Sequence, residues 1–118
     1  MTAILYGIPN CDTVKKARAW LADQGVDYAF HDFKKAGVPP GRLDAWLQAA
    51  GWERLLNRQG STWRKLDADA QLRSGNEGGA RALMLAQPSV IKRPIVEWPD
   101  GAVTVGFDAA AWKARTST

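Results

Sequence analysis

The sequence contains only one cysteine and one histidine among its 118 residues. The single cysteine, Cys11, excludes an internal disulfide, and the single histidine, His31, argues against a zinc site built by the chain alone. No apolar run approaches the ~18 residues that span a bilayer, and residues 1–9 lack the basic start of a secretory signal. We therefore expect a soluble, cytoplasmic protein with no metal and no membrane contact. Any redox chemistry would pair one protein sulfur with a sulfur from outside.

The composition is that of an ordinary globular protein, with 46% hydrophobic and 24% charged residues. A chain of this length is typical of one domain, so we expect a single domain over residues 1–118. Sixteen basic against twelve acidic residues give a net charge of +4, which suits an anionic partner but is too small to indicate nucleic acid. Six tryptophans are spread along the chain, which favours core packing over a base-stacking surface.

The first third of the sequence has the pattern of a strand, a helix and a second strand. Ala3–Tyr6 is a short apolar run typical of a buried strand, and residues 7–10 favour a turn. A helix is expected from about Asp12, with Gly25 as its end. Residues 26–33 are rich in strand formers, and this order predicts that the second strand pairs parallel to the first.

The middle of the chain is predicted to be helical. An amphipathic helix with Leu43, Trp46 and Leu47 on one face ends at Gly51. The segments that follow are short: a helical turn at 52–56, a polar stretch at 57–62, and helices at 68–72 and 80–85 separated by a break at 74–79. Together they predict a helical insertion of about 40–87.

Strand character returns in the last third of the chain. We expect it at Val90–Ile91 and, after an interruption, at Ile95–Trp98. Residues 99–101 (Pro-Asp-Gly) are a strong turn signal, and residues 103–107 pair back as the other arm of a hairpin. A final helix covers about 109–115. The order βαβ, helical insertion, ββα predicts an α/β fold with a mixed sheet covered by helices.

Cys11 is the residue that physical chemistry alone singles out. It stands at the turn from the first strand into the first helix, where unpaired backbone N–H groups carry about half a positive charge and favour the thiolate. Lys15 and Lys16 add positive potential, and Asp12 partly opposes it. The alternative is that Cys11 is a small buried hydrophobic residue, as lone cysteines commonly are.

The second feature is the Arg93-Pro94 pair between two apolar segments. Pro94 cannot donate a hydrogen bond to a central ladder, so it belongs at the start of a strand or at a special peptide bond. Only about 5–6% of X-Pro bonds in folded proteins are cis, so the sequence leaves the isomer of this bond open. Arg93 could equally be a surface arginine beside a strand.

These elements resemble the ArsC/Spx family, which contains glutaredoxin-coupled arsenate reductases and the Spx transcriptional regulators. The resemblance is carried by residues 6–17 (YGIPNCDTVKKA) and 91–95 (IKRPI), in family order. It is closest to the YffB-like branch, through residues 55–57 (LLN), 62–67 (TWRKLD) and 106–107 (GF). The resemblance covers nearly the whole chain. It implies a thioredoxin-like fold with a helical insertion, a nucleophilic Cys11 and a cis Pro94 facing it.

Departures from the family pattern weaken the arsenate reductase reading. Those enzymes surround their cysteine with three arginines, of which Arg93 matches one. The second falls on Asn57, with Arg58 beside it, and the third falls on Gly106, while the family's histidine before the cysteine falls on Gly7. Each missing charge-assisted bond is worth about 1.5–3 kcal/mol, so arsenate would be held poorly.

The Spx reading also departs from its pattern, at Val14. The second cysteine of the oxidation-sensing Cys-x-x-Cys switch would stand there, so the switch is absent. Binding to RNA polymerase without the switch stays an alternative.

The remaining interpretation is a glutathione-dependent thiol reductase with Cys11 as its single nucleophile and no bound cofactor. Glutathione would be the co-substrate, because its two carboxylates suit arginine side chains and the net charge favours its approach. We expect a monomer, and we do not expect His31 to act as a base because it lies in a strand remote in sequence from Cys11. The candidate substrate-binding residues are Arg93, Pro94, Arg58, Arg64, Asn10 and Lys15.

Overall fold

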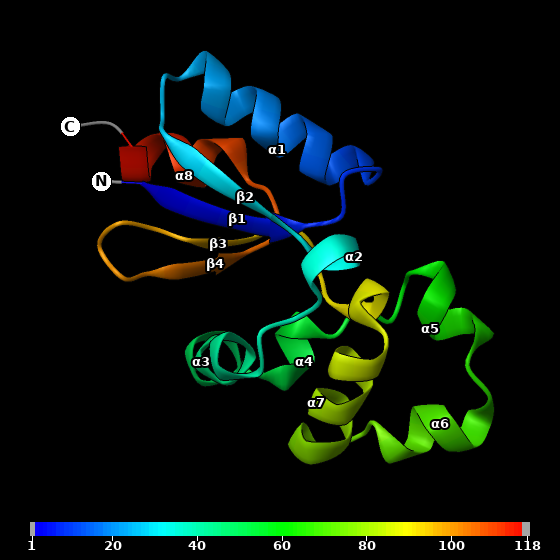
Figure 1. The fold of residues 1–118 in the computed structure, drawn as a ribbon. Helices are drawn as coiled ribbons and strands as arrows, with labels where there is room; N and C mark the ends of the chain where they lie inside the picture. Colours follow the sequence, from blue (N-terminus) through cyan, green and yellow to red (C-terminus); the bar gives the residue numbers. More distant parts are fainter. Residues whose placement is uncertain (1, 117–118) are drawn as a thin grey trace. The chain divides into compact units, whose positions relative to one another are not determined.

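The computed structural model describes residues 2–116, which form two compact units. The sheet unit contains the chain up to Asp32 and again from Arg93, and the helical unit is Phe33–Lys92. The helical unit thus interrupts the sheet unit, as Figure 1 shows by colour. It begins earlier and ends later than the insertion of about 40–87 expected from the sequence. That the whole chain acts as one domain stays a prediction.

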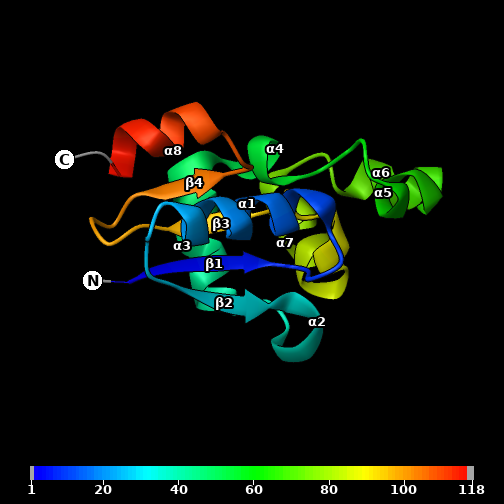
Figure 2. The same cartoon turned by 90° about the horizontal axis from the view of Figure 1, so that it is seen from above.

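The sheet has four strands: β1 (Ala3–Gly7), β2 (Tyr28–Asp32), β3 (Ile95–Glu97) and β4 (Val103–Val105). Their order is β2-β1-β3-β4, with β1 and β2 parallel and the other neighbours antiparallel (Figure 2). In one row across the sheet, Tyr6 pairs with Ile95, and Ile95 with Val105. The predicted mixed α/β sheet, with its parallel first pair and its C-terminal hairpin, is confirmed.

Helices α1 (Asp12–Asp23) and α8 (Ala109–Thr116) cover one face of this sheet (Figure 1). Val14, Ala17 and Leu21 recur at helical spacing, so α1 turns one apolar stripe toward the strands. Trp112 of α8 is 2% exposed and lies edge-on to three other aromatic rings. The buried residues of this core are Ala3, Leu5, Val14, Ala17, Leu21, Val96, Trp98 and Trp112. Most of the tryptophans therefore do pack in or against cores.

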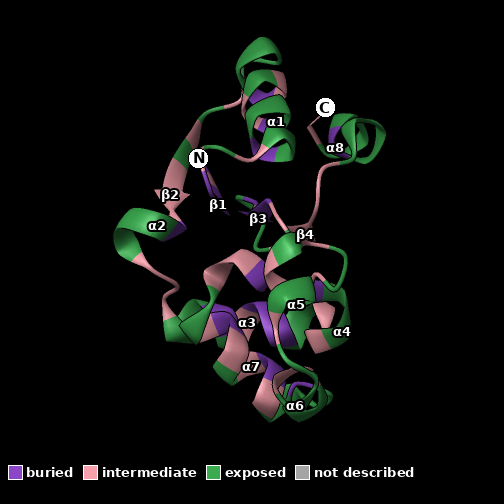
Figure 3. Ribbon diagram, turned by 90° about the vertical axis from the view of Figure 1, so that its right-hand side faces the viewer, coloured by how far each residue is buried: buried purple, intermediate pink, exposed green. Residues whose placement is uncertain are grey.

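The helical unit consists of short helices: α2 (Phe33–Ala36), α3 (Pro40–Ala50), α4 (Trp52–Leu55), α5 (Ser61–Lys65), α6 (Ala68–Arg73), α7 (Glu77–Ala86) and the 3-10 turn η1 (Pro88–Val90). Buried stretches of α3, α4 and α7 gather in its middle (Figure 3). Its buried apolar residues are Phe33, Leu43, Trp46, Leu47, Leu55, Leu56, Ala80, Met84, Val90 and Ile91. Within residues 2–116, no helix is long and apolar enough to span a bilayer.

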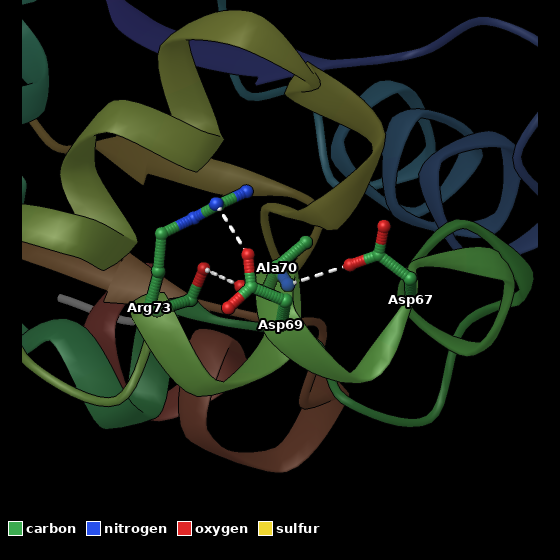
Figure 4. A network of polar contacts seen from close by, with 5 residues as sticks. Asp67, Asp69, Ala70 and Arg73 are labelled. Atoms are coloured by element: carbon green, nitrogen blue, oxygen red, sulfur yellow. Dashed lines mark hydrogen bonds and ion pairs between the residues drawn. The ribbon is translucent and has the colours of Figure 1, made fainter.

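The short helices are stabilised by local polar contacts. Asp67 caps α6 by accepting a hydrogen bond of 2.7 Å from the N–H of Ala70, and Arg73 pairs with Asp69 one turn away at 2.6 Å (Figure 4). Both contacts suit a helix too short to be stable by itself. Asp67 thus marks the start of α6, while the exposed Asp69–Arg73 pair adds little to its stability.

Four local expectations for this unit and its borders were wrong. Phe33 begins α2 instead of ending a strand, and the last two residues of the polar stretch 57–62, Ser61 and Thr62, belong to α5. The break at 74–79 is shorter than expected, because Asn76 accepts a 2.8 Å bond from the N–H of Gly79 and starts α7 at Glu77. The segment Val90–Ile91 is no strand: Val90 closes η1, and Ile91 makes a single bridge to Leu56.

Candidate active site

Cys11 lies where the chain passes from β1 into α1. Its backbone is extended, with φ −82° and ψ 125°, and it occupies the N-cap position of the 12-residue helix. Its N–H donates to the carbonyl of Ile8 at 3.1 Å, and its carbonyl accepts from the N–H of Lys15 at 2.9 Å. The turn therefore fixes the backbone of Cys11 on both sides, which is the position predicted from the sequence.

The approach of α1 to β1 is close at Gly7, the last residue of β1. A Cβ atom on Gly7 would lie 2.8 Å from Cγ2 of Val14, shorter than real carbon contacts. Glycine at position 7 therefore allows the first turn of α1 to pack closely against β1. Gly7 thereby sets the position of the helix end that faces the thiol.

The Cys11 thiol is half-buried and forms no disulfide. Burial is the largest single influence on its pKa and raises it. The N–H of Val14, the guanidinium of Arg93 and the N–H of Thr13 together outweigh burial, so the pKa is lower than that of an ordinary thiol. The Cys11 side chain makes no capping hydrogen bond in the structure. These groups instead favour the thiolate, the reactive form of cysteine.

The structure brings the guanidinium of Arg93 to the Cys11 sulfur, where hydrogen bonding and the positive charge of Arg93 both lower the pKa of the thiol. Arg93 is half-buried and its Nε atom is shielded from solvent, so it is not a surface arginine. The peptide bond from Arg93 to the buried Pro94 is cis, as the resemblance implied and the sequence alone left open. The thiol, Arg93 and Pro94 thus gather in the sheet unit.

The other expected site residues divide between the two units. Asn10 and Lys15 flank Cys11 in the sheet unit and are exposed, but Lys15 does not contribute to the lowered pKa of the thiol. Arg58 and Arg64 are exposed in the helical unit, where the guanidinium of Arg58 lies 5.4 Å from the ring centre of Trp52. Roles for these four residues in substrate binding stay predictions.

His31 lies in β2 beside Tyr6 of β1, and the two ring centres are 5.0 Å apart. The Tyr6 hydroxyl donates to a carboxylate oxygen of Glu97 at 2.8 Å. The causes of the lowered pKa of Cys11 do not include His31. That His31 does not act as a catalytic base stays a prediction.

The sequence predicted that backbone N–H groups at this helix end favour the thiolate. It did not identify the N–H groups of Thr13 and Val14 as the ones that lower the pKa of Cys11. It also gave no role to Gly106, whose N–H donates to the carbonyl of Pro94 at 2.8 Å. The only indication in the sequence was that Gly106 stands where arsenate reductases of the family have their third arginine. Its position next to Pro94 depends on hairpin register, which the sequence did not fix.

The fold and this site define a thioredoxin-like domain with a thiol at the N-terminus of its first helix and a cis-proline at the start of β3. The chain belongs to the ArsC family, whose family model matches residues 6–115.

Two curated relatives illustrate the range of this family. An uncharacterized protein of Haemophilus influenzae is 37% identical over 110 residues, which are 93% of this chain and 95% of that protein. A global transcriptional regulator Spx from Streptococcus pyogenes is 30% identical over 94 residues, 78% of this chain and 69% of the regulator. Sequence similarity therefore extends to proteins named as regulators.

Solved structures agree with the fold. The protein YffB (PA3664) is 47% identical with a TM-score of 0.89, over 95% of this chain and 96% of that one. An arsenate reductase (ArsC) related protein from Brucella melitensis is 50% identical with a TM-score of 0.76, over 100% and 97%. The chain is thus a member of the ArsC family that is similar to YffB, as the sequence motifs indicated.

Proposed function

We propose that the chain is a cytoplasmic, glutathione-dependent thiol reductase in which Cys11 is the only nucleophile. The observation that carries this proposal is the setting of the sulfur. A half-buried thiol at a helix N-cap, with a guanidinium beside it and a lowered pKa, has the properties of a reactive cysteine rather than of a packing residue.

The first step is attack on a mixed disulfide between glutathione and a substrate thiol. The Cys11 thiolate attacks the glutathione sulfur, a new sulfur–sulfur bond forms, and the old bond breaks. The substrate leaves as a thiolate and takes up a proton from solvent. The products are a reduced substrate thiol and a chain with glutathione bound to Cys11, so the oxidation state has passed from substrate to protein.

The second step regenerates the enzyme. The thiolate of a free glutathione attacks the glutathionyl sulfur on Cys11, which releases glutathione disulfide and restores the Cys11 thiolate. Each cycle consumes one free glutathione, and the glutathione disulfide that leaves contains this molecule and the glutathionyl group taken from the substrate. An external thiol is needed here because Cys11 is the only cysteine in the sequence.

Charge supports glutathione as the partner thiol. The guanidinium of Arg93, next to the sulfur, can take one glutathione carboxylate, since a guanidinium presents two parallel donors to such a group. Asn10, Lys15 and the backbone beside Pro94 are further candidates for contacts with the peptide, and Arg58 and Arg64 stay proposed as anion-binding residues of the helical unit. Glutathione is a co-substrate in this scheme, and no bound cofactor or metal takes part.

A second candidate function is regulation through RNA polymerase. Similarity to Spx regulators over 94 residues is the observation in its favour. Valine stands at position 14, so such a regulator would act without an internal disulfide switch. Arsenate reduction coupled to glutaredoxin is a third candidate, and Arg93 is the one arginine that supports it.

The test is turnover of a glutathionylated peptide with free glutathione, followed through release of glutathione disulfide. We expect turnover with the native chain and none with Cys11→Ser, which keeps the shape of the site but lacks the thiol. Replacement of the peptide by arsenate, with glutaredoxin added, tests the third candidate in the same assay. Absence of turnover together with capture of RNA polymerase subunits would favour the regulator.

A further inference from the structure

Gly106 lies at the same end of the sheet as Cys11. The last row paired across β1, β3 and β4 is Tyr6, Ile95 and Val105, and the next residues along these three segments are Gly7, Pro94 and Gly106. The N–H of Gly106 donates to the carbonyl of Pro94 at 2.8 Å. Since Arg93 precedes Pro94 and contacts the Cys11 sulfur, Gly106 borders the proposed site.

The space over Gly106 is open. Its φ is +83°, and a Cβ atom there would meet nothing within 4 Å. Gly7, at the end of β1, is the opposite case, because its Cβ would press against Val14 at 2.8 Å. Packing therefore explains glycine at position 7, whereas glycine at position 106 follows from its positive φ and leaves open space beside the backbone.

We propose that the open space over Gly106 receives the peptide portion of a disulfide substrate whose sulfur reacts with Cys11, which makes Gly106 a specificity-determining residue. The inference rests on the proposed function and names the substrate class: a disulfide with at least one half of tripeptide size. A glycine leaves backbone groups open to close approach by a peptide, and Arg93 stands beside it for a carboxylate.

The role of Gly106 is to admit the substrate and not to take part in the reaction. In the exchange, the substrate disulfide breaks, a disulfide to Cys11 forms, and the departing thiolate takes up a proton. A side chain at position 106 changes neither the electron count nor the lowered pKa of Cys11. It changes only how much room remains for the group attached to the attacked sulfur, so its effect should depend on the size of that group.

Gly101 provides a matched control within the same hairpin. Its φ is +89°, a Cβ there would also meet nothing within 4 Å, and it lies in the turn between β3 and β4. Figure 1 shows this turn at the end of the sheet opposite the turn into α1. A side chain at either glycine imposes the same kind of backbone strain, but only one of the two positions borders the site.

The experiment compares two disulfides of different size on four variants. Glutathione disulfide and bis(2-hydroxyethyl) disulfide react with Gly106→Ala, Gly106→Asn, Gly101→Ala and Gly101→Asn, and the rate of adduct formation on Cys11 is measured by mass. Asparagine tolerates a left-handed backbone better than other larger residues, and the alanine variants serve if asparagine prevents folding.

We expect Gly106→Asn to slow the reaction with glutathione disulfide about tenfold, the scale of a misfit of one small group in a pocket. The reaction with the hydroxyethyl disulfide should stay within about twofold, and Gly101 variants should react like the native chain. Gly106→Ala should also slow the reaction with glutathione disulfide more than the reaction with the hydroxyethyl disulfide, but by a smaller factor. Equal slowing of both disulfides, or no change in either, overturns the inference while Cys11 still reacts. If the native chain forms no adduct with either disulfide, the proposed function fails as well.

Discussion

The guanidinium of Arg93 lies beside the sulfur of Cys11 and helps to hold its pKa below that of an ordinary thiol. Cys11 occupies the N-cap of α1, and Arg93 is the first residue of the sheet unit after the helical unit. The contact therefore joins two segments that are distant in the sequence. Burial would by itself raise the pKa of Cys11, and the N–H groups of Val14 and Thr13 act with Arg93 against it. The account of function depends on this balance.

Alkylation of Cys11 should begin at lower pH than alkylation of free cysteine. The lowered pKa makes the thiolate, the form that reacts, abundant below about pH 8.5, the usual thiol midpoint. The rate of reaction with iodoacetamide, measured across pH, gives the midpoint directly. A midpoint at or above that of free cysteine would show that burial prevails over the N–H groups and Arg93.

Replacement of Arg93 by alanine should raise the pKa of Cys11 and weaken substrate engagement by about 1.5–3 kcal/mol, the range of a charged hydrogen bond. Arg93→Lys should recover only part of this loss, because an ammonium lacks the two-pronged geometry. The measurements are the alkylation midpoint and the ratio kcat/KM. Lys92→Ala is the control, since it removes an exposed positive charge one residue away. A large fall in melting temperature with unchanged Cys11 reactivity would make Arg93 a structural residue.

The contribution of the Cys11 thiol to stability should increase with pH. Its pKa is lower in the folded chain than in the unfolded one, so the unfolded state binds more protons in the interval between the two values. The stabilisation is fully present above the unfolded pKa and is lost as pH falls through the folded pKa. Urea unfolding of native chain and Cys11→Ser at several pH values measures it. A gap between the two proteins that shrinks with rising pH contradicts the lowered pKa.

A methyl group at Gly7 should destabilise the fold by about 1–3 kcal/mol, as expected when a packed contact is overfilled. The cause is the 2.8 Å approach to Cγ2 of Val14. The double variant Gly7→Ala/Val14→Ala should cost less than the sum of the two single variants, because the second change removes the clash. Chemical denaturation provides the free energies.

Gly41→Ala is the control for this prediction. Gly41 lies in α3, where a Cβ would meet nothing within 4 Å, so alanine there should be neutral or stabilising. Additive costs at Gly7 and Val14 would mean that the helix end adjusts without strain.

The sequence predicted the framework of the site because that framework depends on local patterns. The strand at Ala3, the turn after it and the apolar stripe of α1 place Cys11 at the helix N-cap, whatever the rest of the chain does. The hairpin around residues 99–101 was predicted for the same reason. Motif resemblance added the cis Pro94, which local propensity could not decide.

The remaining features depend on contacts between distant segments. The meeting of Arg93 with Cys11 follows from the pairing of β3 with β1, and the position of Gly106 follows from the register of β3 with β4. In the helical unit, α2 and α5 were missed because each is a single turn or little more, too short for an apolar stripe of helical spacing. Such turns are held by their surroundings, which a sequence pattern does not display.

The measurement that tests the central claim most directly is a single turnover of the native chain with a glutathionylated peptide, without free glutathione. We predict that one glutathionyl group per chain appears on Cys11, located by peptide mapping, as one equivalent of free peptide thiol is released. Added glutathione should then remove the group and yield glutathione disulfide. Release of peptide thiol without an adduct on Cys11, or no reaction at all, would contradict the account.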